Sequence, residues 1–190
     1  MLRLDFYESG IGETTVITFP SGGIGIVDAH PSPNAIRPSI ADLVKDHHIH
    51  FVCLTHPHLD HAADLVSILE THPEIEEFWH TVPDAQAFFY GLEEFNNFPS
   101  AAAGVVRDMH RGVANVFIDL FGAVTQRLEA KRIVSRKILS EYRPMQFDGV
   151  EIIIISPSES VSGAFNKALA ERLASKQGNL PDANNLSAIL

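Results

Sequence analysis

The first part of the chain alternates between apolar and polar side chains, and this alternation predicts β-strands. Residues 2–7 follow it closely, and residues 14–19 are β-branched and apolar. Gly22 and Gly23 separate the second segment from a third apolar run over residues 24–27. The three segments together predict a β-meander.

Beyond the meander, helical and strand-like patterns take turns. Helical spacing of apolar positions begins at residue 39 and leads into residues 50–55, a nearly continuous apolar run that is typical of a buried strand. Helical spacing returns over residues 61–71, and a further strand is predicted at residues 75–79. Strands that alternate with helices in this way predict the α/β fold class.

The rest of the chain is predicted to be mainly helical, with one more strand. Residues 83–139 have a helical tendency, and the basic run at residues 127–137 is interpreted as a solvated helix face rather than an anion-binding surface. A strand is predicted over residues 146–155 and an amphipathic helix over residues 160–176. A final apolar run starts at residue 185.

Composition indicates one soluble domain. The chain has 190 residues, 45% of them hydrophobic, so we expect a single domain over residues 1–190 with one substantial core. The net charge of −10 argues against a broad basic surface, and nucleic acid is expected only as a possible substrate. No apolar stretch approaches the roughly 20 residues that span a bilayer. The single cysteine, Cys53, excludes an internal disulfide framework, and a cytoplasmic protein is expected.

A dense group of histidines follows the predicted strand at residues 50–55. The group consists of His56, His58, Asp60 and His61. Imidazole nitrogens and carboxylate oxygens are ligands that suit zinc, and related sites also take manganese or iron. Backbone alternation would place His56 and His58 on the same side, and the following turn would bring the other two side chains back toward them. The pattern predicts metal binding, with a degenerate motif of structural histidines as the alternative.

The HxHxDH spacing of this group resembles the signature of the metallo-β-lactamase superfamily. The resemblance extends to residues 25–29 on the predicted meander. The tail at residues 184–190 looks like the branch of that superfamily that contains the hydrolase domain of bacterial DNA-uptake channel proteins. The resemblance implies a metallo-β-lactamase-like αββα sandwich with two Zn²⁺ ions, Mn²⁺ or Fe being possible replacements.

The resemblance also implies a role for each residue of the motif. His56 and His58 would hold the first metal, and Asp60 and His61 would hold the second. Asp28 would brace the motif loop without touching either metal. The second half of the superfamily fold usually donates a bridging aspartate and a last histidine, and neither can be placed in this chain. We therefore expect an incomplete sandwich, C-terminally truncated and completed by a missing segment, a homo-oligomer or a complementing chain.

The remaining histidines carry less information. His72, His80 and His110 are candidates for a further ligand, but none has motif support, and an unassigned histidine is more often a surface or satisfied residue. His47, His48 and His50 lie where a helix is predicted to close and a strand to begin. A favourable interaction with the helix C-terminal dipole explains these three without a ligand role.

The function that this motif predicts is hydrolysis by a metal-dependent enzyme. A mono- or dinuclear zinc-type site would activate a water to attack a phosphodiester or other ester-like bond, and Asp60 would orient that water and accept its proton. Phosphodiesters are favoured by the closer resemblance, while small-molecule thioesters and lactams remain open. The alternative is a non-catalytic metal-binding or assembly module. The aromatic residues within 88–98 are interpreted as core or substrate-pocket wall.

Overall fold

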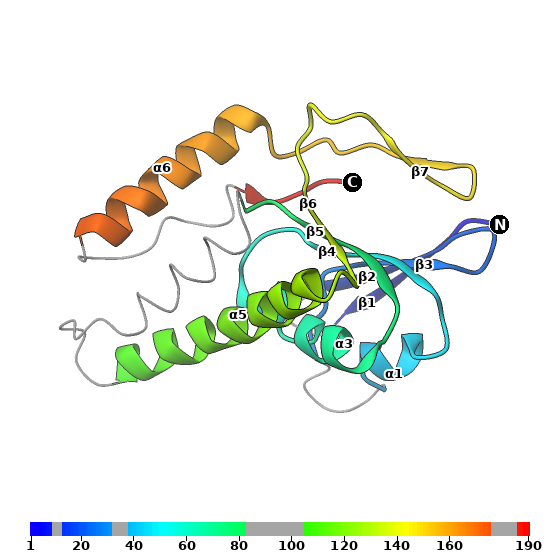
Figure 1. Cartoon of the computed structure of the whole chain (residues 1–190), viewed down its shortest axis with the longest axis horizontal. Helices are drawn as coiled ribbons and strands as arrows, with labels where there is room; N and C mark the ends of the chain where they lie inside the picture. Colours follow the sequence, from blue (N-terminus) through cyan, green and yellow to red (C-terminus); the bar gives the residue numbers. More distant parts are fainter. Residues whose placement is uncertain (9–12, 32–37, 83–104, 176–185) are drawn as a thin grey trace.

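A six-stranded mixed sheet is the centre of the fold (Figure 1). The computed structural model describes residues 1–8, 13–31, 38–82, 105–175 and 186–190. The strands of the sheet are β1 Arg3–Glu8, β2 Glu13–Thr18, β3 Ile24–Val27, β4 Ile49–Leu54, β5 Ile75–His80 and β6 Val134–Lys137. They lie side by side in the order of the chain, from β1 to β6.

The pairing of the strands confirms the predicted meander and the α/β class. β1 pairs antiparallel with β2, and β2 pairs antiparallel with β3. From β3 to β6 every pairing is parallel. Parallel neighbours need crossover connections, and helices supply them here.

Helices cover one face of the sheet. They are α1 Ile40–Val44, α2 Leu59–Ala62, α3 Leu65–Thr71 and α5 Val105–Glu129, and α6 Glu159–Ser175 follows later in the chain. Figure 1 shows α1, α3 and α5 along the same side of the sheet. Ser39 begins α1, because its side chain accepts a hydrogen bond from the Asp42 amide. Within the described residues, no helix is long and apolar enough to cross a membrane.

The helix predicted over residues 61–71 is confirmed from residue 65 onward, but it is not continuous, because the chain forms two short helices, α2 and α3. Asp64 lies between them, and its amide donates to the Ala29 carbonyl at 3.0 Å. Its carboxylate accepts a hydrogen bond from the Ile40 amide at 3.1 Å. An amide that bonds outside the helix leaves the helical ladder, so Asp64 ties the two helices to the loop after β3.

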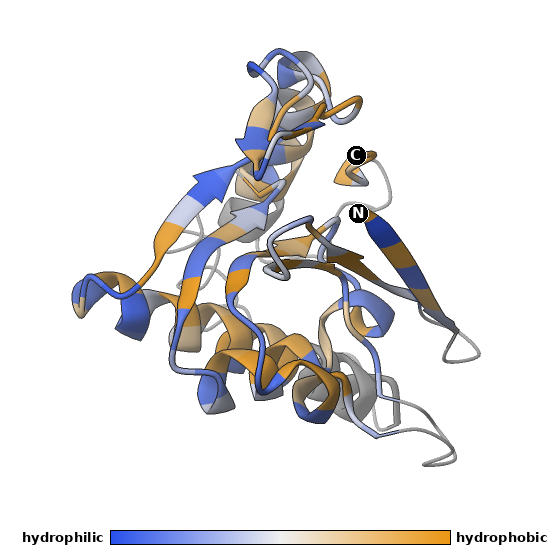
Figure 2. Ribbon diagram, turned by 90° about the vertical axis from the view of Figure 1, so that its right-hand side faces the viewer, coloured by the Kyte–Doolittle hydropathy of each residue, from blue (hydrophilic) through white to orange (hydrophobic). Residues whose placement is uncertain are grey.

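Apolar side chains pack on both faces of the sheet. On the helix face, Val52 and Leu54 of β4 share a buried cluster with Phe121 of α5. On the opposite face, Phe51 and Cys53 belong to a second buried cluster. In Figure 2 much of the ribbon of the helices beneath the sheet has the colour of hydrophobic residues. Because both faces are covered, β4 has the nearly continuous apolar sequence of a buried parallel strand.

The long strand predicted over residues 146–155 is instead a hairpin. Its strands are β7 Met145–Phe147 and β8 Val150–Ile152, which pair antiparallel. Asp148 and Gly149 connect them with φ of 50° and 79°. Positive φ at both central residues matches the right-handed twist of a tight hairpin, and an Asp-Gly pair supplies it at low cost. The hairpin packs on the face of the sheet that the helices leave open.

The basic run at residues 127–137 is not a solvated helix face along its whole length. Arg127, in the last turn of α5, donates to the backbone carbonyls of Leu69 and His72. Arg136 lies in β6, where its guanidinium bonds both carboxylate oxygens of Glu77 at 2.6 and 2.8 Å. The sequence of β6 is too polar to stand out after a long helix, which is why the strand was not predicted.

Candidate metal centre

The histidine motif lies at the carboxyl ends of two parallel strands. β4 ends at Leu54, and the chain then turns into α2, which carries Asp60 and His61. The neighbouring strand β3 ends at Val27, so Asp28 emerges beside the motif. Loops at the carboxyl edge of a parallel sheet are the usual place for binding groups, because each strand delivers its next residues there.

Asp28 joins the two strands to the motif loop. Its backbone has a φ of 53°, and its amide donates to the Cys53 carbonyl at 2.8 Å. Its buried carboxylate accepts hydrogen bonds from the Thr55 amide at 2.8 Å and the Thr55 hydroxyl at 2.6 Å. The same carboxylate contacts Nδ1 of His61 at 2.7 Å. One side chain therefore holds both the start and the end of the loop.

These contacts set which nitrogen of each histidine carries a proton. An ionised carboxylate only accepts, so Nδ1 of His61 donates to Asp28 and Nε2 carries the lone pair. The Thr55 hydroxyl gives its only proton to Asp28, and it therefore accepts the Nδ1 proton of His56, 3.0 Å away. Both imidazoles thus present Nε2 as the atom that can bind a cation.

Burial and the surrounding charges and hydrogen bonds act in opposite directions on the pKa values of Asp28 and His61. Burial raises the pKa of the Asp28 carboxyl more than the hydrogen bonds with His61 and Thr55 lower it. Burial lowers the pKa of His61, but the hydrogen bond and charge of Asp28, together with the charge of Asp60, raise that pKa above its usual value. The surroundings of His61 therefore favour added positive charge.

His58 and Asp60 complete the group at the start of α2. His58 precedes the first helical turn with an extended backbone, and its ring centroid lies 4.7 Å from that of His56. Asp60 lies in the first turn, with an oxygen 3.4 Å from Nε2 of His61. The ring centroids of His61 and His56 are 4.1 Å apart. Each of the four side chains expected as ligands therefore lies beside at least one other member of the motif.

Two further segments contact the first residue of the motif loop. The Ala188 amide donates to the Thr55 carbonyl at 3.0 Å, and the Thr81 hydroxyl, after β5, donates to the same carbonyl at 3.0 Å. The Ser187 hydroxyl lies 3.4 Å from Nδ1 of His56. The loop is thus fixed from β3, from β5 and from residues 186–190, an arrangement that a rigid binding site requires.

The other candidate histidines do not join the motif in the described part of the chain. His80 is buried, with Nδ1 2.7 Å from the Val82 carbonyl and Nε2 2.9 Å from the Ser135 hydroxyl. His72 ends α3 and precedes β5, so it lies at the amino ends of the parallel strands, opposite the motif. The side chain of His110 and the aromatic residues within 88–98 lie outside the described residues.

A second group of ligand atoms lies at those amino ends. One nitrogen each of His48 and His50 and one carboxylate oxygen of Glu76 lie within 4.8 Å of one another. Among the described residues, no other three His, Cys, Asp or Glu side chains bring ligand atoms this close together. The residues of the HxHxDH motif do not reach this spacing either. The helix-dipole interpretation of His48 and His50 gives way to their contacts with Glu76, 28 and 26 residues away in sequence. His50 and Glu76 lie at the same sheet edge because β4 pairs in parallel with β5. The sequence alone does not show this pairing, so it could not predict the group.

No protein-family model matches this chain, and the comparison with curated proteins found no match either. The resemblance of the HxHxDH spacing to the metallo-β-lactamase superfamily therefore stays a prediction.

Proposed function

We propose that this chain carries the centre of a metal-dependent hydrolase of the metallo-β-lactamase type. Its ligands are His56, His58, Asp60 and His61, and its cofactor is Zn²⁺ or a similar divalent ion. The fold is compatible with this proposal, because a sheet with helices on one face and a β-hairpin on the other fits the first half of an αββα sandwich.

The observation that carries the proposal is the double effect of Asp28. Histidines that bind metal through one nitrogen almost always donate the other N–H to a carboxylate, a carbonyl or another acceptor. Asp28 gives His61 this arrangement directly, and it gives His56 the same arrangement through the Thr55 hydroxyl. A buried carboxylate costs free energy unless it is well bonded. Asp28 therefore leaves Nε2 of both imidazoles as the atom that can bind a cation, and this supports a metal-binding role for the motif.

The chemistry of the donor set supports hydrolysis. A divalent cation held by these side chains would lower the pKa of a water toward about 7 and would stabilise the anion that forms on an ester-like substrate. Asp60 is half-buried beside His61 and has oxygens that could orient the attacking water and accept its proton. Asp28 would keep His61 in place while charge develops nearby. A phosphodiester is the substrate class that we favour.

A second candidate is a metal-binding module without catalytic activity. One observation favours it: among the described residues, no three ligand atoms at the motif, whether from its own side chains or from additional ones, lie within 4.8 Å of one another. Such a module would bind metal through the same histidines but would not turn over a substrate. The two candidates therefore differ in activity and agree on metal binding.

The test combines zinc content with hydrolysis of a generic phosphodiester, bis(4-nitrophenyl) phosphate. We expect zinc-dependent turnover by the unchanged chain, and Asp60→Asn should lower the rate by at least about 100-fold because the group that handles the proton is lost. Asp46→Asn is the matched control, since Asp46 is an exposed carboxylate away from the motif. His58→Ala should release zinc from the motif.

The outcomes separate the candidates. Zinc bound at the motif without any turnover would contradict the hydrolase and support the module. Retention of all bound zinc by His58→Ala would contradict both candidates, because each assigns His58 as a ligand.

A further inference from the structure

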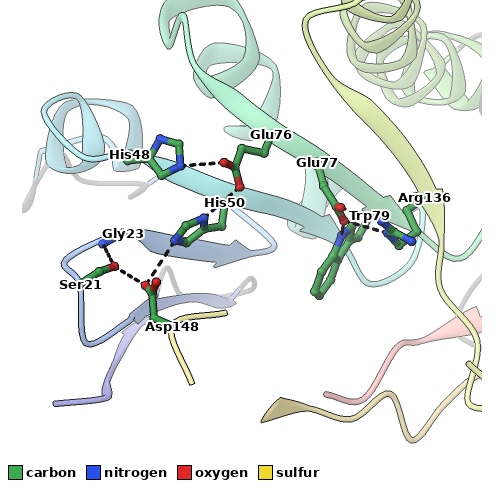
Figure 3. A network of polar contacts seen from close by, with 9 residues as sticks. All are labelled: Ser21, Gly23, His48, His50, Glu76, Glu77, Trp79, Arg136 and Asp148. Atoms are coloured by element: carbon green, nitrogen blue, oxygen red, sulfur yellow. Dashed lines mark hydrogen bonds and ion pairs between the residues drawn. The ribbon is translucent and has the colours of Figure 1, made fainter. Parts of the chain in front are cut away.

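Two histidines and a glutamate converge at the amino ends of β4 and β5, at the opposite end of β4 from the motif. Nε2 of His48 lies 3.0 Å from one carboxylate oxygen of Glu76. Nδ1 of His50 lies 2.9 Å from the other oxygen of the same carboxylate. Figure 3 shows Glu76 between the two rings.

The backbone places His50 in this position. Consecutive residues Ile24 and Gly25 of β3 pair with Ile49 and Phe51 of β4, so His50 is an extra residue on its strand. Such a bulge turns a side chain out of the regular alternation of a strand. Gly23 leaves room for the ring, since a Cβ atom there would lie 2.4 Å from Nε2 of His50.

A second carboxylate stands behind His50. Nε2 of His50 is buried and lies 3.5 Å from an oxygen of Asp148, in the turn of the hairpin (Figure 3). The Ser21 hydroxyl also bonds Asp148. His50 thus has one nitrogen toward Glu76 and the other toward a carboxylate that can accept its proton.

The order carboxylate, imidazole, ligand position is the one found around metal-bound histidines. In such sites a carboxylate accepts a hydrogen bond from the ring nitrogen that does not bind the metal. Two imidazole nitrogens and a carboxylate oxygen form a ligand set for a borderline divalent metal. With bonds of roughly 2.0–2.1 Å, tetrahedral ligands lie about 3.4 Å from one another. The contacts of Glu76 with His48 and His50, 3.0 and 2.9 Å, need to open by only a few tenths of an ångström.

We propose that His48, His50 and Glu76 form a second, separate binding site for a zinc-type divalent cation, with Asp148 supporting His50 from behind. The site joins β4 and β5 through its ligands and the β7–β8 hairpin through Asp148. Its existence does not depend on the hydrolase function, because it lies at the other end of β4 and shares no residue with the motif.

The test is calorimetric titration of the full chain with Zn²⁺, together with zinc content after desalting. The variant is His48→Ala/Glu76→Gln, which keeps the fold intact because both side chains are about half exposed. The matched control is His47→Ala/Glu74→Gln, which removes an exposed histidine and an exposed glutamate next to the group. We expect the control to bind zinc as the unchanged chain does and the variant to lose one zinc equivalent, or to bind it at least tenfold more weakly.

Equal zinc stoichiometry and affinity in variant and control would overturn the proposal, and so would a chain that binds zinc only at the motif. A further variant tests whether zinc binding depends on the position of the His50 ring and not only on the presence of the three ligands. Gly23→Ala keeps all three ligands but displaces the His50 ring. It should also weaken the same zinc equivalent, whereas unaltered binding would show that His50 is not a ligand.

Discussion

Asp28 has an unusual backbone conformation, and both oxygens of its carboxylate accept hydrogen bonds. A φ of 53° lies in the left-handed region, which residues with a side chain rarely adopt and which Asp and Asn tolerate best. This conformation aims the carboxylate back at Thr55 and His61 instead of letting it continue along the strand. The strained backbone of Asp28 costs free energy locally, and the hydrogen bonds of its side chain hold the motif loop in place.

Asp28→Asn tests that control without changing the backbone preference. We expect zinc affinity at the motif to fall by about 10- to 100-fold, because the amide cannot accept all the hydrogen bonds that hold His61 and Thr55. The free energy of unfolding should fall by about 1–3 kcal/mol, because a buried donor loses its partner. Zinc titration and urea unfolding measure the two effects.

The control is Asp46→Asn, which should change neither quantity. Lowered stability with unaltered zinc affinity would show that Asp28 supports the fold but does not position a ligand. That result would remove the main support for the hydrolase.

At the scale of elements, close packing around β3 and β4 constrains the sheet that carries the motif. Gly25 of β3 faces the Phe51 ring, which in turn stacks on Trp79 with centroids 3.8 Å apart and planes 2° from parallel. All three residues lie on the hairpin side of the sheet. The absence of a side chain at Gly25 lets the aromatic stack lie flat against the strand.

Gly25→Ala should therefore destabilise the protein by about 1–3 kcal/mol, because the new Cβ would lie 2.4 Å from Phe51 and the stacked ring cannot retreat. Gly163→Ala, in α6, is the control, since a Cβ there meets nothing within 4 Å. It should stabilise the helix by up to about 1 kcal/mol. Urea unfolding measures both, and equal stability of Gly25→Ala and the unchanged chain would refute this packing argument.

Elements that are determined by residues close together in sequence could be predicted, and elements that depend on distant contacts could not. β1 to β5 follow from alternation and apolar runs, and Ser39 begins α1 as a capping residue should. The break at Asp64 depends on bonds to Ala29 and Ile40, which are distant in sequence. β6 depends on pairing with β5 and on Arg136 with Glu77, so no short window could reveal it. The Asp148-Gly149 turn was readable as a hairpin signal and was missed.

At the scale of the whole molecule, the two ends of the parallel strands carry different groups. His50 is the second residue of β4 and His56 lies two residues after the end of the strand, so the six residue steps from His50 to His56, at about 3.3 Å each, separate the two groups by roughly 20 Å. The motif was visible in sequence because its ligands are consecutive. The second group was not, because it depends on strand pairing and on a bulge. The net charge of −10 means that the chain as a whole attracts cations more than anions.

The most direct test of the central claim, that the HxHxDH loop is a metal centre, is anomalous diffraction at the zinc edge from crystals of the zinc-loaded chain. We expect a strong peak at about 2.0–2.1 Å from Nε2 of His56 and from a neighbouring motif ligand, beyond the carboxyl end of β4. A peak near His48 and His50 would lie roughly 20 Å away and could not be confused with it. A zinc-loaded crystal with no peak within bonding distance of His56, His58 or His61 would contradict the claim.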